Sequence, residues 1–292
     1  FIIDRAVLDG ANLRAGAKGS MSRFNALDVD YEAYARGPYS FGGLDLTGDL
    51  ESFGKIAGTR DNPRLTLQAK APGAVAGGVA FSNVVLEADL PNLGKGVAGR
   101  ATLAAAAHGE RIDASTNFAM KGARVSLADL NAKWNGGVMT GALSVGGGAP
   151  IEGRVDAEGS IAPFVDGRGT VKASLRLSNQ KGRQGIDLDA DGRDLEIARV
   201  QADLDRVKLQ LQGTTDAMNL SASARGWTDR AFVVNAAGPI SLRDGERRAS
   251  LSLDGRYGRD VIASKGPVEI AMSAQAFSAK GAVTMGAGSF DV

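Results

Sequence analysis

The stretch that decides the fold is VQADLDRVKLQL, residues Val200–Leu211. Apolar and polar side chains alternate from Val200 to Leu204, and the alternation resumes at Val207. A period of two residues places successive side chains on opposite faces of a β-strand. We interpret Asp205-Arg206, where the alternation is interrupted, as a two-residue turn that pairs Leu204 with Val207. The stretch therefore predicts a β-hairpin with one apolar face and one polar face.

The same alternation recurs along most of the chain and is most regular after residue 150. Polar side chains fill the intervening positions of those later segments, with Ala271 as the exception. Short turns rich in Gly, Asn, Asp or Arg separate the segments, and no segment with a helical period lies between them. We expect roughly twenty short strands. Because parallel strands need long crossover connections, the sheet is predicted to be antiparallel.

Four local signals refine this interpretation. Asn135-Gly136 is the dipeptide most typical of a tight hairpin turn, and His108-Gly109-Glu110 is predicted to be a second hairpin turn. The alternation slips at Ala128-Asp129, which we interpret as a β-bulge. Glu51–Asn62 lacks a clear alternation, so we expect an insert there that is not a strand.

The composition excludes several classes of protein. The 292 residues include 34 basic and 33 acidic side chains, so no excess of positive charge indicates nucleic-acid binding. The absence of cysteine excludes disulfides and thiolate metal sites. No apolar stretch reaches the roughly 20 residues of a membrane-spanning helix. The chain begins at Phe1 rather than Met, and we interpret it as a fragment or a processed form.

One break divides the chain. Gly146–Pro150, with sequence GGGAP, is the stretch most typical of a linker. We expect one sheet segment over residues 1–145 and a continuing segment over residues 151–292. The two segments are interpreted as repeats of one design, and one continuous domain is the alternative.

A face that is apolar along so many strands must be covered by another part of the protein or by a partner. It can pack on a second sheet, line a closed barrel, or curl into an open trough. Aromatic residues make up only 5% of the chain, and a lining of Ala and short aliphatic side chains is thin for a sandwich core. We therefore predict an all-β, elongated, antiparallel curled sheet, an open solenoid-like trough with an apolar concave face. The residues expected to line it are Leu130, Leu143, Val171, Leu175, Leu177, Ile186, Leu188, Val200, Leu204, Val207, Leu209, Leu211, Met218, Leu220, Leu251, Leu253, Val268, Ile270 and Met272.

Two segments resemble a known family. Val125–Val145, VSLADLNAKWNGGVMTGALSV, resembles the recurring unit of the AsmA-like superfamily, in which an Asn-Gly-Gly hairpin joins a strand to a Gly-containing return strand. VKLQLQGTTDAMNLSASARG, within Val200–Gly226, looks like the repeats of the TamB (translocation and assembly module) members of that superfamily. The motif is a pattern of strands rather than of catalytic residues. YdbH-type and other AsmA-like proteins stay open as alternatives.

The resemblance implies a periplasmic protein of the Gram-negative cell envelope, anchored in the inner membrane by a helix outside this chain. It implies a long curled sheet of the β-taco type and a role in outer-membrane biogenesis. Phospholipid is the cargo that it suggests, and an outer-membrane barrel protein of the TamA type is a candidate partner. This chain would then be an internal or C-terminal piece of the whole protein.

Three motifs could be mistaken for chemical sites. Asp187–Gly192, DLDADG, resembles the start of a calcium loop, but the twelfth position is Ala198 rather than the required Glu. His108 is the only histidine and lies in a predicted surface turn without a nucleophile nearby. Gly146–Gly148 is not followed by the Lys-Ser or Lys-Thr of a phosphate loop. We expect no catalytic residue, metal site or cofactor.

Some aromatic and basic residues leave two interpretations open. Trp134 and Trp227 both end predicted strands, where they can either line the trough or pack within a hairpin. Arg247-Arg248 can contact lipid headgroups or simply keep the outer face of the sheet in water.

The expected function is a conduit that carries phospholipid acyl chains in an apolar groove between the inner and outer membranes, with support of outer-membrane protein assembly as a further role. Each CH₂ group removed from water contributes about 0.8 kcal/mol. The alternative is a structural or adhesive secreted β-solenoid, whose apolar core would be fully buried. An enzyme is not expected, because one histidine, no cysteine and no clustered carboxylates offer little for catalysis.

Overall fold

The fold is described from a computed structural model, which covers residues 2–41, 44–197, 200–243, 246–272 and 276–291. The chain forms two compact units. Unit 1 comprises Phe1–Gly147 with Pro163–Val165, and unit 2 comprises Gly148–Ala162 with Asp166–Val292. The chain first passes from unit 1 to unit 2 between Gly147 and Gly148.

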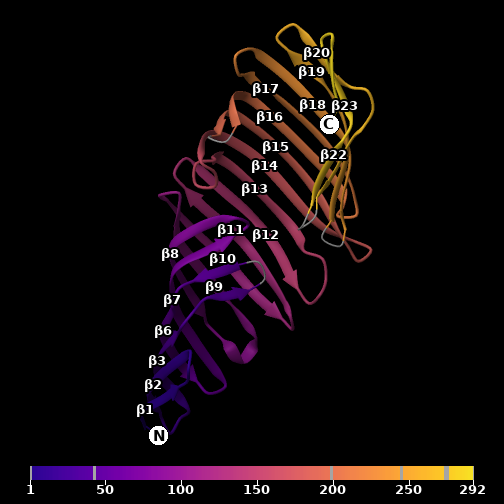
Figure 1. Ribbon diagram of the computed structural model, residues 1–292. Coiled ribbons are helices and arrows are strands. Elements are labelled where there is room, and N and C mark those ends of the chain that lie inside the picture. The colour runs from indigo at the N-terminus through magenta and orange to yellow at the C-terminus, as the bar shows by residue number, and fades with distance from the viewer. Residues whose placement is uncertain (1, 42–43, 198–199, 244–245, 273–275, 292) are drawn as a thin grey trace. The chain divides into compact units, whose positions relative to one another are not determined.

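Unit 1 is built almost entirely of strands (Figure 1). They are β1 (Ile2–Asp9), β2 (Leu13–Met21), β3 (Ala26–Ala35), β4 (Tyr39–Phe41), β5 (Leu44–Thr47), β6 (Leu50–Thr59), β7 (Asn62–Ala76), β8 (Val79–Leu90), β9 (Val97–Ala107), β10 (Glu110–Lys121), β11 (Arg124–Trp134) and β12 (Gly137–Gly146). A single turn of 3-10 helix, Leu93–Lys95, connects β8 to β9.

The strands of unit 1 form one antiparallel sheet. Its order is β1-β2-β3-β6-β7-β8-β9-β10-β11-β12, with neighbours paired along most of their length. The short β4-β5 hairpin joins this row because β5 pairs with the C-terminal part of β7, beyond the end of β6. Almost every connection is a tight turn between neighbouring strands, as the antiparallel prediction requires.

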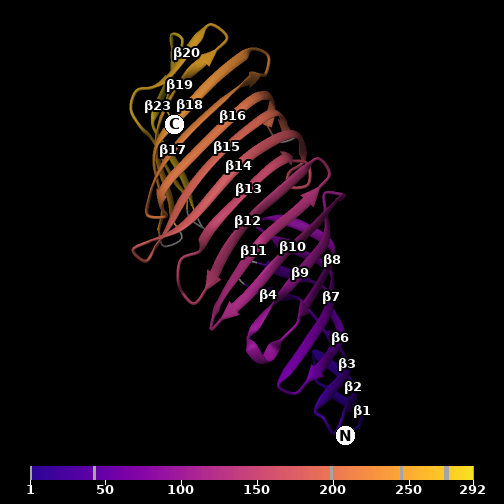
Figure 2. The ribbon, with the colours of Figure 1, turned by 180° about the vertical axis from the view of Figure 1, so that it is seen from behind.

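Unit 2 is also built of strands, of which β14 to β19 lie side by side in Figures 1 and 2. They are β13 (Glu152–Ser160), β14 (Gly167–Gln180), β15 (Arg183–Ile197), β16 (Val200–Thr214), β17 (Ala217–Trp227), β18 (Ala231–Arg243), β19 (Glu246–Tyr257), β20 (Asp260–Ser264), β21 (Val268–Met272), β22 (Phe277–Lys280), β23 (Ala282–Met285) and β24 (Gly288–Asp291).

Strands β13 to β19 of unit 2 pair in sequence order. Beyond them, β20 and β21 pair with the two halves of β19, β22 pairs with β21, and β23 pairs with β20 and β24. The predicted all-β, antiparallel, curled sheet is confirmed. Within the described residues each unit forms a single sheet that does not close on itself, which differs from a two-sheet sandwich.

The prediction of a turn at Asp205-Arg206 is wrong, because β16 is one strand from Val200 to Thr214. Leu204 pairs with Gly226 and Arg206 with Arg225, so Asp205 is an extra residue against β17. Such a β-bulge restores the alternation after a slip of one residue. A turn and a bulge therefore both place Leu204 and Val207 on one face, and the sequence pattern alone does not separate them.

The prediction of a non-strand insert at Glu51–Asn62 is also wrong, because β6 occupies Leu50–Thr59 and pairs with β3 and β7. Its alternation is hard to recognise because Phe53 lies on the polar side, opposite Gln68, while the small Gly54 lies on the apolar side, opposite Leu67. The sheet tolerates this inversion because its neighbours supply the apolar side chains.

Three other local predictions are confirmed. Asn135-Gly136 forms the turn between β11 and β12, since Trp134 pairs with Gly137. His108-Gly109 forms the turn between β9 and β10, and His108 adopts a positive φ of 48° there. The register of β11 shifts at Ala128-Asp129, where Asp129 has a φ of 53°.

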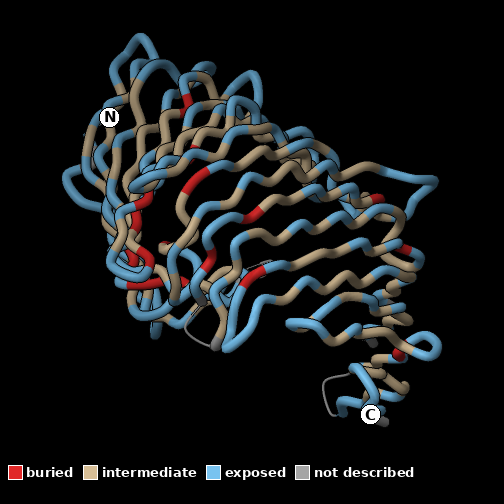
Figure 3. The backbone as a smooth tube through the Cα atoms, turned by 90° about the horizontal axis from the view of Figure 1, so that it is seen from above, coloured by how far each residue is buried: buried red, intermediate tan, exposed pale blue. Residues whose placement is uncertain are grey.

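Few apolar side chains are fully buried. Figure 3 shows intermediate and exposed positions alternating along the strands, with buried positions confined to short stretches. In the described ranges the buried hydrophobic residues are Ala71, Ala74, Leu90, Ala105, Ala107, Ile112, Ala132, Leu195, Met218 and Val268. Alanine makes up half of this set, so the small side chains are shielded by the curl of the sheet while most larger ones keep contact with solvent.

Candidate functional site

The predicted apolar positions of unit 2, joined by further apolar residues of β13 and β18, come together in rows that cross the sheet at right angles to its strands. In one row, Val155 lies opposite Leu175, and Leu175 lies opposite Leu188. Leu188 lies opposite Leu211, which in turn lies opposite Leu220. Directly opposed residues of antiparallel strands have Cβ atoms about 5 Å apart. The row is therefore a continuous aliphatic band from β13 to β17.

Two further rows flank this band. The first consists of Ala157, Ala173, Ala190, Leu209, Ala222, Ala236 and Leu253. The second consists of Leu177, Ile186, Gly213, Met218, Ile240, Ala249 and Ile270. With a strand spacing of about 4.8 Å, the six steps from β13 to β19 give an apolar face about 29 Å long.

The other face of unit 2 is polar, as the alternation predicts. Asp189 lies opposite Gln210 and accepts a hydrogen bond from its Nε2 at 2.8 Å. Arg206 Nε donates to Asp191 Oδ1 at 3.1 Å. The hydrogen bond from Arg206 is the main cause that lowers the pKa of Asp191. Charged side chains on this face thus pair with one another, which leaves the opposite face to the aliphatic rows.

Most of the residues predicted to line the trough keep partial contact with solvent. Met218 and Val268 are buried, with 1% and 7% of their surfaces exposed, whereas Met272 is exposed. Val200 begins β16, but its side chain lies outside the described set. The half-buried members are Leu130, Leu143, Val171, Leu175, Leu177, Ile186, Leu188, Leu204, Val207, Leu209, Leu211, Leu220, Leu251, Leu253 and Ile270.

Unit 1 carries a matching apolar face, of which Leu130 and Leu143 were the predicted members. They are not directly opposed, because Leu130 lies opposite Gly141 and Leu143 lies opposite Leu127 across the bulge. Both are half-buried and lie on the same side of the sheet.

Two residues of this face were not predicted from the sequence. Leu86 lies opposite Leu103, and Leu103 lies opposite Ala114. Leu86 and Leu103 are 38% and 37% exposed although they stand in an apolar row. The alternation from Leu86 to Leu90 is the signal that could have identified the first of them. Their exposure shows that the apolar face of unit 1 is open to solvent at this point.

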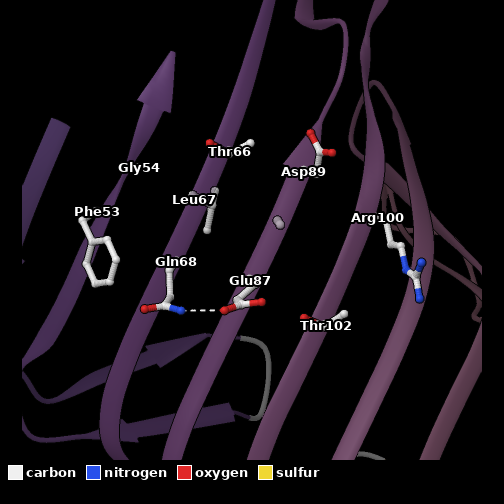
Figure 4. Close-up of a pocket in the computed structure, with 10 residues that line it drawn as sticks. Phe53, Gly54, Thr66, Leu67, Gln68, Glu87, Asp89, Arg100 and Thr102 are labelled. Atoms are coloured by element: carbon white, nitrogen blue, oxygen red, sulfur yellow. Dashed lines mark hydrogen bonds between the residues drawn. The ribbon is translucent and has the colours of Figure 1, made fainter. Parts of the chain in front are cut away.

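A hollow of about 450 Å³ lies on the polar face of unit 1. Figure 4 shows Phe53, Gln68, Glu87 and Thr102 side by side from four strands, with a hydrogen bond of 2.6 Å from Gln68 Nε2 to Glu87 Oε1. The Phe53 ring also lies 5.1 Å from the ammonium group of Lys70. Gln68 and Glu87 thus already bond to each other within the hollow, and the hollow lies on the opposite face of the unit 1 sheet from Leu86 and Leu103.

The motifs weighed as chemical sites are parts of strands and turns. Asp187 and Asp189 lie on the polar face of β15, where Asp189 is bonded to Gln210. His108 is exposed in its turn. Among the described residues, no group of three or more metal-ligating side chains comes together. No helix within the described ranges combines the length and apolar character needed to cross a bilayer.

The two tryptophans have different surroundings. Trp134 is half-buried on the apolar side of β11, opposite Ile112, and its ring meets Phe164 edge-on at 5.1 Å. Trp227 lies on the polar side of β17, opposite Asp203, and is 54% exposed. Trp134 therefore packs against Ile112 of the neighbouring strand and Phe164 of the segment between β13 and β14, whereas Trp227 does not stand among the aliphatic rows.

No protein-family model and no curated protein matches this chain. The arrangement of side chains is thus the basis for a functional interpretation. An open aliphatic face of this length can shield hydrocarbon from water, and it offers few polar groups that would orient a small polar substrate.

Proposed function

We propose that the protein binds the acyl chains of phospholipids along its apolar faces and acts as a conduit for lipid within the cell envelope. The observation that carries this proposal is the set of apolar rows that together cross β13 to β19, most of whose larger side chains remain half-exposed. An apolar surface of this extent is unfavourable in water unless a partner covers it.

The energetics favour hydrocarbon as that partner. Each CH₂ group that moves from water onto the face contributes about 0.8 kcal/mol. The rows run across the strands without a change of chemistry, so an acyl chain that slides along them keeps the same kind of contact at each step. The absence of strong directional groups in the rows therefore suits movement better than tight fixation.

The location and the partners belong to the same proposal. We infer membership of the AsmA-like superfamily, most like TamB, from the Asn-Gly-Gly hairpin unit at Val125–Val145 and from the loose hairpin repetition. This would place the protein in the Gram-negative periplasm, with an inner-membrane anchor outside the chain. An outer-membrane barrel protein of the TamA type would be its protein partner.

The experiment compares substitutions on the two faces of one strand. Leu220→Asp introduces a charge into the aliphatic rows, and Ser221→Asp introduces the same charge at the next residue, on the polar face. Phospholipid that co-purifies with each variant is quantified by lipid extraction and native mass spectrometry. We expect Leu220→Asp to lose most of the bound lipid, because a carboxylate next to hydrocarbon must be desolvated. We expect Ser221→Asp to retain it.

A second measurement does not depend on the stability of the variants. A photo-crosslinking amino acid at position 209 or 220 should capture phospholipid, and one at position 210 or 221 should not, since Leu220 and Ser221 also alternate across the sheet. Equal capture from both faces, or no lipid on either, would refute the proposed conduit. A lipid-free protein with a covered apolar face would favour the structural β-solenoid instead.

A further inference from the structure

The adjacent residues Arg247 and Arg248 point to opposite faces of unit 2. On β19, Ala249, Leu251 and Leu253 belong to the aliphatic face, and the strand is regular from Arg247 to Leu251 in its pairing with β21. Two-residue periodicity therefore places Arg247 on the aliphatic face and Arg248 on the polar face.

Arg247 stands among large apolar side chains at the end of this face. It lies opposite Leu242 on β18 and opposite Met272 on β21, and Met272 lies opposite Phe277 on β22. All three apolar side chains are exposed, Phe277 by 69%. A cationic group is thus surrounded by uncovered hydrocarbon, where the aliphatic rows reach the ends of the strands.

The guanidinium group of Arg247 has no partner in the part of the chain that the structure describes: neither an ion pair nor a hydrogen bond involves it. Arg206 and Arg183 of unit 2, by contrast, are paired with Asp191 and, at 3.4 Å, with Asp216. A guanidinium group presents a planar fork of donors that matches two oxygens of a phosphate or carboxylate. Arg247 therefore combines a free anion-binding group with an apolar surface that continues into the rows.

We propose that Arg247 binds the phosphate group of a phospholipid whose acyl chains lie on the aliphatic face, with Leu242, Met272 and Phe277 in contact with the first part of those chains. This inference rests on the proposed function, and it adds a place for the headgroup and a requirement for negative charge. The phosphate takes the two donors of the guanidinium fork, and the hydrocarbon covers the exposed apolar side chains.

The test measures the affinity of the whole chain for two single-chain amphiphiles below their micelle concentrations. One is a lysophosphatidylglycerol, and the other is a monoacylglycerol with the same acyl chain but no phosphate. Arg247→Gln should weaken binding of the lysophospholipid about tenfold, the value of one lost charge-assisted hydrogen-bonded contact, and should leave the monoacylglycerol unchanged. Arg248→Gln, the matched control on the polar face, should change neither affinity.

Two further measurements keep the inference testable if Arg247→Gln lowers stability. Arg247→Lys keeps the charge but loses the fork, so it should restore only part of the affinity for the lysophospholipid. In the unmodified protein, added salt should weaken binding of the lysophospholipid more than binding of the monoacylglycerol, because salt screens exposed charges.

The outcomes separate this inference from the function on which it rests. Equal affinity for both amphiphiles, or an unchanged affinity of Arg247→Gln for the lysophospholipid, overturns the role of Arg247 and leaves the conduit in place. A protein that binds neither amphiphile overturns both proposals. Inorganic phosphate alone that binds as tightly as the lysophospholipid would show an anion site without a lipid, which also overturns the inference.

Discussion

At the scale of single residues, Arg64 and Asp89 show how the polar face is neutralised. Arg64 Nε donates to Asp89 Oδ1 at 2.9 Å, and its terminal nitrogen lies 2.7 Å from Oδ2. These hydrogen bonds hold the pKa of Asp89 below its ordinary value of 3.8. Because the pKa is lower in the folded state, the stabilisation by this pair is complete above about pH 4 and disappears as the pH falls through the folded pKa.

Arg64→Gln should therefore raise the pKa of Asp89 toward its ordinary value. The measurement is an NMR titration of the aspartate side-chain carboxyl carbons between pH 2 and pH 6, a range of about two units on either side of that value. Asp156, whose pKa is lowered by Arg154 in the other unit, serves as the internal control and should not move. The pair is well exposed, so only a small change in the free energy of unfolding is expected. An unchanged pKa of Asp89 would contradict the assignment.

At the scale of single elements, the strands were predictable because alternation is a direct consequence of strand geometry. The irregularities within the strands were harder to predict. The bulge at Ala128-Asp129 was recognised because it breaks a strong pattern, whereas the bulge at Asp205 was mistaken for a turn, since both restore the same faces. In β6 the alternation was missed because Phe53 points to the polar side. The pairing with the neighbouring strand decides these cases, and the pattern within a single strand carries no information about that pairing.

The bulges of β15 and β16 give an element-scale prediction. Asp194 and Asp205 occupy equivalent places, because β15 and β16 stay in step past them while β14 and β17 are each one residue short. Deleting Asp205 alone should put β16 out of step with β15 and turn part of it to the wrong face. Deleting Asp194 and Asp205 together should restore a regular ladder on all four strands.

The measurement is the midpoint of thermal unfolding of both deletion variants, followed by circular dichroism. We expect the single deletion to lower the midpoint clearly and the double deletion to recover most of that loss. The backbone packs closely beside the bulge, since a Cβ at Gly226 would lie 1.9 Å from the carbonyl oxygen of Asp203. A residue shifted to this position by the single deletion would therefore clash, which adds to the expected loss of stability. A double deletion that is less stable than the single one would refute the compensation.

At the scale of the whole molecule, the sequence predicts which face of the sheet is apolar, but it does not predict which residues of that face contact one another. The alternation identified the large apolar members of the rows on β14 to β17, β19 and β21, but not Val155 and Ala157 of β13 or Ala236 and Ile240 of β18. Which residues oppose one another depends on register, and register includes the bulges. Leu86 and Leu103 were missed because their row in unit 1 is interrupted by alanines. The alternation predicts that Arg247 and Arg248 point to opposite faces. The apolar neighbours of Arg247 could not be predicted in this way, because they come from three other strands.

The exposed surface supports an open apolar face. The chain exposes 18165 Å², whereas a compact protein of 30.0 kDa is expected to expose about 11,700 Å². Part of the excess is apolar, because Leu86, Leu103 and Met272 remain exposed on the apolar faces of the two units. A protein that keeps this surface in water loses part of the hydrophobic stabilisation available to a closed core.

This surface should be detectable in the native state with the dye ANS, whose fluorescence rises on exposed apolar surface. We expect strong fluorescence from the folded protein, because the rows are already accessible, and a fall when urea unfolds the sheet. Added lysophosphatidylglycerol should displace the dye, since both occupy the same face, and Leu220→Asp should reduce the signal more than Ser221→Asp. Fluorescence that appears only on partial unfolding would mean that the aliphatic rows are covered in the native protein, and it would remove the physical basis for a lipid-binding face.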